Sequence, residues 1–140
     1  MVKILLNFQE VTDLEFLDSK TLILTTKDSG IYTAEINQFN NSIELKKLYN
    51  TKNCFKYKKN IALGKKLILI KSDFTKLVAL DYNNNNQIKW TLQLEENNLI
   101  GNLVHLVNDC FCFNTNNKIF IIENQKIKNI QNFSNVKNLL

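Results

Sequence analysis

The middle of the chain alternates short apolar runs with short polar breaks. Apolar runs at residues 67–70, 77–80 and 88–94 are separated by a few polar residues each, and a shorter run at 61–63 precedes them. Runs of this length between turn residues are typical of β-strands joined by tight connections. The pattern therefore predicts four antiparallel strands in sequence order. Four asparagines at residues 83–86 are predicted to form a hairpin tip, because Asn tolerates left-handed backbone conformations.

The same four-strand pattern occurs once before and once after this segment. Strands are predicted at residues 14–17, 22–25, 31–36 and 43–49, and again at residues 103–107, 110–113, 118–122 and 126–130. A lead strand is predicted at residues 2–6. A tight turn is predicted at residues 27–30, where Gly30 is expected to take a positive φ. The chain is thus expected to be a single all-β domain of three repeats, at about residues 11–50, 51–97 and 98–131.

Three sets of equivalent positions agree on the length of the repeat. The second strands begin at Leu22, Leu67 and Cys110, the third at Ile31, Leu77 and Ile119, and the fourth at Ile43, Ile88 and Ile127. These positions recur about every 40 to 46 residues, and four short strands per period of this length are typical of propeller blades. One blade cannot bury both of its faces alone, so neighbouring blades have to stack on it.

The second repeat also resembles a known family. Leu77-Val78-Ala79-Leu80-Asp81, a turn, and then Ile88-Lys89-Trp90 resemble the ALD–turn–W pattern of quinoprotein-type (PQQ-like) propeller repeats, and the repeat length resembles that of WD40-like blades. The resemblance implies that Trp90 packs between neighbouring sheets. Ala34-Glu35-Ile36 and Ile121-Ile122-Glu123 occupy the matching places in the other repeats, without a matching Trp, and the Gly usual in the turn is replaced by Asn.

The resemblance also bears on activity. PQQ-like propellers include quinone-dependent dehydrogenases and non-enzymatic assembly scaffolds. Nothing in this chain matches the cofactor-ligating residues of the enzymes, so the resemblance implies a scaffold without a cofactor.

Three repeats are fewer than the four or more blades of a closed propeller. The chain is therefore expected to be a partial or split propeller, completed by another subunit or by pairing of two copies into a six-bladed ring. A β-trefoil is the alternative fold, because it closes with three four-stranded repeats of about this length.

The charge balance is mildly basic, with 18 Lys and Arg against 13 Asp and Glu, for a net charge of +5. An acidic partner such as nucleic acid fits this balance. An AT-rich genome fits it too, because Asn, Lys, Ile and Leu dominate and Pro is absent. The Lys-rich segment at residues 50–60, with Phe55 and Tyr57, is predicted to be an outer strand whose aromatics cover the sheet. The alternative is a surface on which bases stack.

Cysteine usage and hydropathy bear on location. No apolar run approaches the roughly 20 residues of a membrane helix, and no secretory signal is found. Cys54, Cys110 and Cys112 form an odd set, and the last two are predicted to share one side of a strand, where they cannot easily bridge each other. Reduced thiols and an intracellular location, cytoplasmic or organellar, are expected.

No catalytic, cofactor-binding or metal-binding residues are predicted. His105, on an alternating strand, is expected to be a packed or surface histidine. Aspartates are expected at turns, where they bond nearby backbone N–H groups, and these are Asp18, Asp28, Asp73, Asp81 and Asp109. The glycines are isolated, so no phosphate-binding loop is predicted.

The sequence thus favours a non-catalytic β-propeller-type scaffold or interaction subunit of a larger protein or ribonucleoprotein complex, with open blade faces completed by a partner. A protein partner or self-association is expected, with nucleic acid as a weaker candidate. The alternative is a small trefoil-like or barrel-like domain that binds glycan or nucleic acid.

Overall fold

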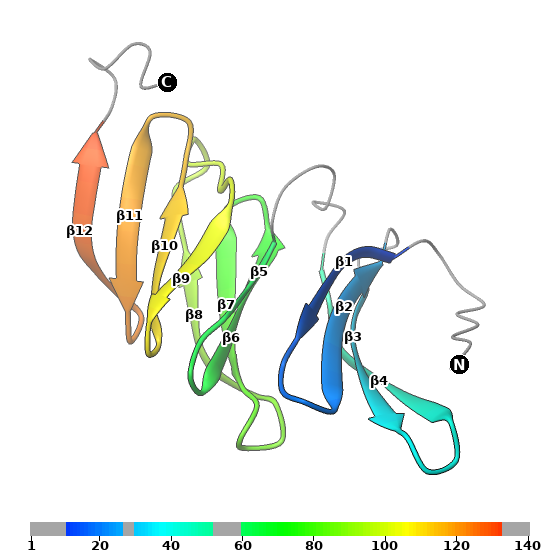
Figure 1. The fold of residues 1–140 in the computed structure, drawn as a ribbon. Coiled ribbons are helices and arrows are strands. Elements are labelled where there is room, and N and C mark those ends of the chain that lie inside the picture. Colours follow the sequence, from blue (N-terminus) through cyan, green and yellow to red (C-terminus); the bar gives the residue numbers. More distant parts are fainter. Residues whose placement is uncertain (1–10, 27–29, 52–59, 133–140) are drawn as a thin grey trace, which may run out of the picture. The chain divides into compact units, whose positions relative to one another are not determined.

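The computed structural model describes residues 11–26, 30–51 and 60–132. The predicted lead strand at residues 2–6, Asp28, Cys54 and the aromatics of the Lys-rich segment lie outside the described residues. The chain divides into two compact units, residues 1–56 and 57–140. The regular elements in the described ranges are all β-strands (Figure 1). No helix there is long and apolar enough to cross a membrane.

The first unit holds one antiparallel sheet, sheet A, with its strands in sequence order. Its strands are β1 (Val11–Phe16), β2 (Thr21–Thr26), β3 (Gly30–Asn37) and β4 (Ser42–Asn50). Leu22 pairs with Ala34, and Ala34 pairs with Leu45, so these three side chains form one row across the sheet. The row belongs to a cluster of apolar residues on this face, in which Leu22 and Ala34 are buried.

The second unit holds two such sheets. Sheet B consists of β5 (Ile61–Leu63), β6 (Leu67–Asp73), β7 (Lys76–Asp81) and β8 (Gln87–Gln93). Sheet C consists of β9 (Leu103–Val107), β10 (Cys110–Asn114), β11 (Lys118–Glu123) and β12 (Lys126–Asn132). The predicted fold class is confirmed, because each repeat forms its own sheet from four consecutive antiparallel strands. The β-trefoil alternative is not the observed fold, since no strand in the described ranges leaves the sheet of its own repeat.

The turns agree with the sequence in one place and correct it in another. Asn85 and Asn86 have φ values of 55° and 56°, as predicted for the asparagine tip between β7 and β8. The prediction of a positive φ at Gly30 was wrong, because no glycine in the described part of the chain has one. Gly30 instead begins β3, and a Cβ atom there would lie 2.5 Å from the ring of Tyr32. The need at this position is for space, not for a left-handed backbone.

The core of the second unit lies between sheets B and C. Sheet B contributes Leu67, Leu69, Leu77, Ala79 and Trp90, and sheet C contributes Phe111, Phe113, Phe120 and Ile122. Phe113 and Phe120 stack with their ring centroids 4.8 Å apart. Trp90 is only 8% exposed, which confirms the packing between neighbouring sheets that the family resemblance implied. Its indole Nε1 has no hydrogen-bond partner among the described residues, so Trp90 contributes through apolar contact.

Candidate interaction surface

Asp109 fixes one end of the contact between sheets B and C. It lies in the turn between β9 and β10, and its Oδ1 accepts hydrogen bonds from the backbone N–H groups of Lys66 and Leu67, at 2.9 and 3.0 Å. Next to it, the N–H of Lys65 donates to the carbonyl oxygen of Asn108 at 2.9 Å. Asp109 occupies a turn, as predicted. Its partners are not nearby in sequence, however, but belong to the β5–β6 turn of the preceding repeat.

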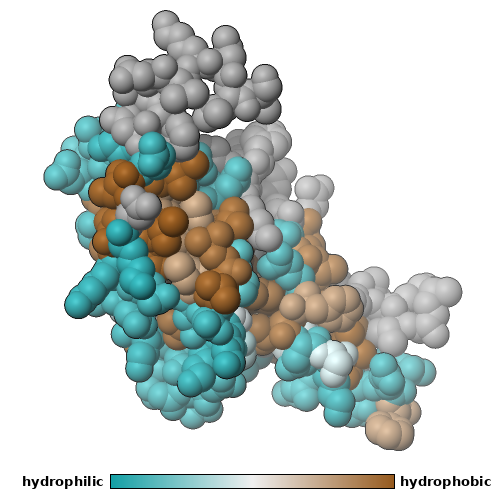
Figure 2. Space-filling view, turned by 60° about the vertical axis from the view of Figure 1, so that its left-hand side comes forward, coloured by the Kyte–Doolittle hydropathy of each residue, from teal (hydrophilic) through white to brown (hydrophobic). Residues whose placement is uncertain are grey.

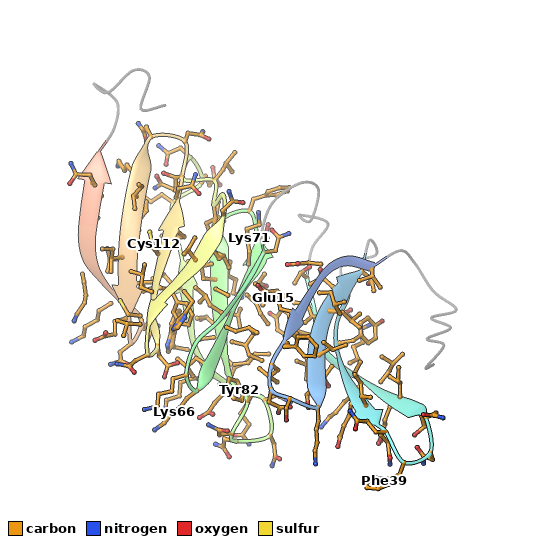
Figure 3. All side chains as sticks on the ribbon, in the orientation of Figure 1. Glu15, Phe39, Lys66, Lys71, Tyr82 and Cys112 are labelled. Carbon is orange, nitrogen blue, oxygen red and sulfur yellow. The ribbon has the colours of Figure 1, made fainter. Side chains whose placement is uncertain are left out.

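Gly64 allows these two turns to approach each other. A Cβ atom at this position would lie 2.5 Å from Asp109 Oδ1, 2.7 Å from Cζ of Phe111 and 3.0 Å from the carbonyl oxygen of Asn108. Two of these neighbours are a hydrogen-bonded carboxylate and backbone, which do not move cheaply. Tyr82 closes the same end of sheet B, because its hydroxyl donates to the carbonyl oxygen of Gly64 at 3.1 Å (Figure 3).

The segment that connects the two sheets is held at both ends. The N–H of Ile100 donates to the carbonyl oxygen of Phe74, in the β6–β7 turn, at 2.7 Å. The N–H of Gly101 donates to the carbonyl oxygen of Asn114 at 2.7 Å, and the N–H of Asn102 donates to its Oδ1 at 2.8 Å. These bonds tie the connection to β10 of sheet C on one side and to sheet B on the other. Sheets B and C are therefore joined by directional contacts as well as by apolar packing.

Lys71 lies inside this contact. It is on β6 and is only 1% exposed, and its Nζ donates to the carbonyl oxygen of Ile100 at 3.3 Å. An ammonium group costs free energy when it is removed from water, and hydrogen bonds to carbonyl oxygens offset part of that cost. Lys71 thus helps to position the connecting segment.

The opposite face of sheet C is apolar and open to solvent. Phe111 and Phe113 point into the core, so Cys112 between them points to the other face. Val104 and Ile121 lie directly across from Cys112 on the neighbouring strands. Val104 is 47% exposed and Leu106 is 46% exposed. We call this surface the open face of sheet C, and it consists of Val104, Leu106, Cys112, Ile119 and Ile121. Figure 2, which turns sheet C forward, shows apolar side chains gathered over it.

The cysteines of β10 are free thiols, in agreement with the prediction that they do not bridge each other. Cys110 is buried, and Cys112 is half-buried at the centre of the open face (Figure 3). Burial raises the pKa of the Cys112 thiol above its ordinary value, and the nearby Cys110 is a smaller cause of the same shift. Cys112 therefore remains protonated at neutral pH, where it acts as an apolar side chain of this face.

The other residues considered from the sequence are separate from this face. His105 is exposed, with its Nε2 2.7 Å from the carbonyl oxygen of Asn108 and its ring against Phe111, so it is a surface histidine with a structural contact. Asp18 and Asp81 accept hydrogen bonds from nearby backbone N–H groups at their turns, as predicted. In the described ranges, no group of three or more His, Cys, Asp and Glu residues is placed to hold a metal ion.

Sequence reasoning predicted open blade faces but did not say which residues form one, and it did not identify the Asp109 contact. The face had one available signal, because β9, β10 and β11 carry apolar residues at both alternating sets of positions. Such a pattern predicts a sheet with both faces buried. In the described structure only one of the two faces of sheet C is packed in the core.

Solved structures that are similar to this chain include two propeller-containing proteins. The crystal structure of the WD40 beta propeller domain of Doa1 matches it with a TM-score of 0.64 at 11% identity, over 85% of this chain and 39% of that one. The crystal structure of BBS1N in complex with ARL6DN, soaked with mercury, matches with a TM-score of 0.63 at 9% identity, over 87% of this chain and 39% of that one. The chain thus spans about two fifths of each.

No protein-family model matches the sequence, and no curated protein sequence matches it. At these identities the likeness shows the fold alone. The WD40-like part of the predicted resemblance is supported, whereas the PQQ-like part stays a prediction. The three sheets of the described chain have the fold of WD40-like β-propeller blades.

Proposed function

We propose that this chain is a non-catalytic, propeller-type subunit that binds protein within a larger protein or ribonucleoprotein complex. The open face of sheet C carries this proposal. Val104, Cys112 and Ile121 lie in one row across three paired strands, so their apolar surface is continuous. A contiguous apolar surface of this kind favours protein contact, because covering it removes apolar area from water.

The rigidity of the second unit supports the same proposal. The open face belongs to a sheet whose other face is anchored by Trp90, the Asp109 contact and the fixed connecting segment. A surface held this way loses little conformational freedom on binding, which favours affinity. BBS1N, from one of the solved structures that are similar to this chain, was itself crystallised in complex with ARL6DN.

The test is whether the chain has a partner of fixed stoichiometry. The tagged chain is expressed in its native cells, purified under mild conditions and analysed by size-exclusion chromatography with light scattering. We expect a defined complex well above the 16.3 kDa of the chain. Nuclease treatment before purification separates direct protein binding from tethering through nucleic acid. A monodisperse monomer that retains no partner contradicts the proposal.

A further inference from the structure

The open face of sheet C is the counterpart, in the next repeat, of a face that the chain itself covers. Strand pairing establishes this equivalence position by position. On sheet B, Leu67 pairs with Asp81 and Leu69 with Ala79, and on sheet C, Cys110 pairs with Glu123 and Cys112 with Ile121. The next pairs, Lys71 with Leu77 and Asn114 with Ile119, also correspond.

The correspondence extends across all four strands. The central row of sheet B runs through Ala62, Leu69, Ala79 and Trp90, and that of sheet C runs through Val104, Cys112, Ile121 and Asn129. All four members of the sheet B row are buried in the core that sheet C completes. In the second unit, a face of this kind is therefore covered by another four-stranded antiparallel sheet.

We infer that the open face of sheet C receives a four-stranded antiparallel sheet from a partner protein, stacked on sheet C as sheet C is stacked on sheet B. This inference rests on the proposed function, and it names the kind of surface that the partner presents. The similarity to the Doa1 propeller domain fits it, because sheets of this kind stack in series in a propeller.

The side chains of the open face specify the shape of the partner. The central row of sheet B alternates small and large residues, with Ala62 and Ala79 beside Leu69 and Trp90. On sheet C the order is reversed, because the small Cys112 lies between the larger Val104 and Ile121. The partner sheet is thus expected to place a bulky apolar side chain over Cys112, since facing layers interdigitate.

The charge at the margin of the face points to the same kind of partner. Glu123 lies across from Cys110 at the end of β11, and its carboxylate is 3.1 Å from Nζ of Lys128. This carboxylate is therefore already paired with a cation of its own sheet. The row of Val104, Cys112 and Ile121 offers no cation to a phosphate, so an apolar partner surface fits this face better than a nucleic-acid backbone does.

The first experiment tests the location of the contact. Ile121→Lys places a charge in the open face, and Ile88→Lys is the matched control on β8, where Ile88 is already exposed. We expect Ile121→Lys to weaken partner binding at least about 100-fold, with Val104→Lys acting alike and Ile88→Lys close to wild type. Unchanged fluorescence of Trp90 confirms that each variant is folded. If wild type and Ile121→Lys bind the partner equally, this inference is overturned while the proposed function stands.

The second experiment tests the kind of occupant. The photo-reactive residue p-benzoyl-phenylalanine replaces Leu106, which is 46% exposed on β9 at the edge of the open face, and is photo-cross-linked within the purified complex. We expect the cross-link to map, by mass spectrometry, to a bulky apolar residue on a β-strand of the partner. A cross-link to a second copy of this chain, to a helix or to nucleic acid overturns the inference. If the wild-type chain retains no partner of any kind, the proposed function itself is refuted, and the inference with it.

Discussion

Asp109 is predicted to hold sheets B and C together through a contact that spans two repeats. Its Oδ1 accepts hydrogen bonds from the N–H groups of Lys66 and Leu67, and Asp109→Ala removes both. The two N–H groups then lose a charged acceptor. Water replaces it readily at Lys66, which is exposed, and less readily at Leu67, which is buried.

The size of the effect follows from these two environments. A hydrogen bond to a charged group contributes about 1.5 to 3 kcal/mol when it is shielded from water, and less when it is exposed. The shielded bond to Leu67 should contribute nearly its full value and the exposed bond to Lys66 only a small part. Asp109→Ala should therefore lower the unfolding free energy by about 2 kcal/mol. With a urea m-value of about 1.5 kcal/mol per molar, the unfolding midpoint should fall by about 1 M.

The assay is urea unfolding of the whole chain, followed by the fluorescence of Trp90. This is the only tryptophan in the sequence, and it is buried between sheets B and C. Asp81→Ala is the matched control, because Asp81 Oδ1 bonds the N–H of Asn83 within one turn, and its loss should change the midpoint little. Asp109→Asn keeps an acceptor oxygen but not the charge, so its unfolding midpoint should lie between those of wild type and Asp109→Ala. If Asp109→Ala unfolds at the wild-type midpoint, or if Asp81→Ala costs as much, the reasoning is refuted.

Four further predictions follow from the same structure. Trp90→Ala should cost about 3 to 5 kcal/mol in urea unfolding followed by circular dichroism, whereas Trp90→Phe should cost much less because the indole N–H has no described partner. Gly64→Ala should destabilise the second unit by about 1 to 3 kcal/mol, and less in an Asp109→Ala background, as a double-mutant cycle would show. Alkylation of Cys112 by iodoacetamide should be slow at pH 7 and should rise at alkaline pH, because its raised pKa keeps the thiol neutral; a rate at pH 7 matching that of an exposed cysteine would contradict this. The pKa of Asp18 is lowered, and the largest cause is the hydrogen bond that its carboxylate accepts from the Lys20 N–H. The stabilisation of the β1–β2 turn by the Asp18 carboxylate should therefore be complete above the ordinary Asp pKa of about 4 and be lost as pH falls further. Amide exchange at Lys20 and Thr21 measures this loss, and Asp18→Asn should show no such pH dependence.

The strands and most turns were predictable because their causes are local. The predicted strand at residues 103–107 coincides with β9, and most of the others differ from the observed bounds by only a few residues at their ends. Asn85 and Asn86 take the left-handed conformations that their side chains tolerate. The first strand is the largest difference, since β1 begins at Val11 rather than at residue 14. The start of this strand was missed because Thr12 and Asp13 are polar and interrupt the apolar pattern.

The glycines mark where local reasoning failed. Gly30 was assigned a backbone role, but its φ is not positive, and what it provides is room for the ring of Tyr32. Gly64 provides room for Asp109 and Phe111, which are more than 40 residues away in sequence. Space between distant segments is a property of the folded chain, and no pattern within a repeat encodes it.

The sequence by itself determined that three meanders of four strands form, because alternation and turn chemistry act over a few residues. The packing of Trp90 against a neighbouring sheet was implied only by the family resemblance. Only the tertiary structure decided that Asp109 bonds a turn in the preceding repeat, at separations of 43 and 42 residues. It also decided that one face of sheet C packs on sheet B while the face around Cys112 stays open. Apolar residues at both alternating sets of positions make both faces of sheet C apolar, but which of the two faces is covered depends on the segments that fold against it.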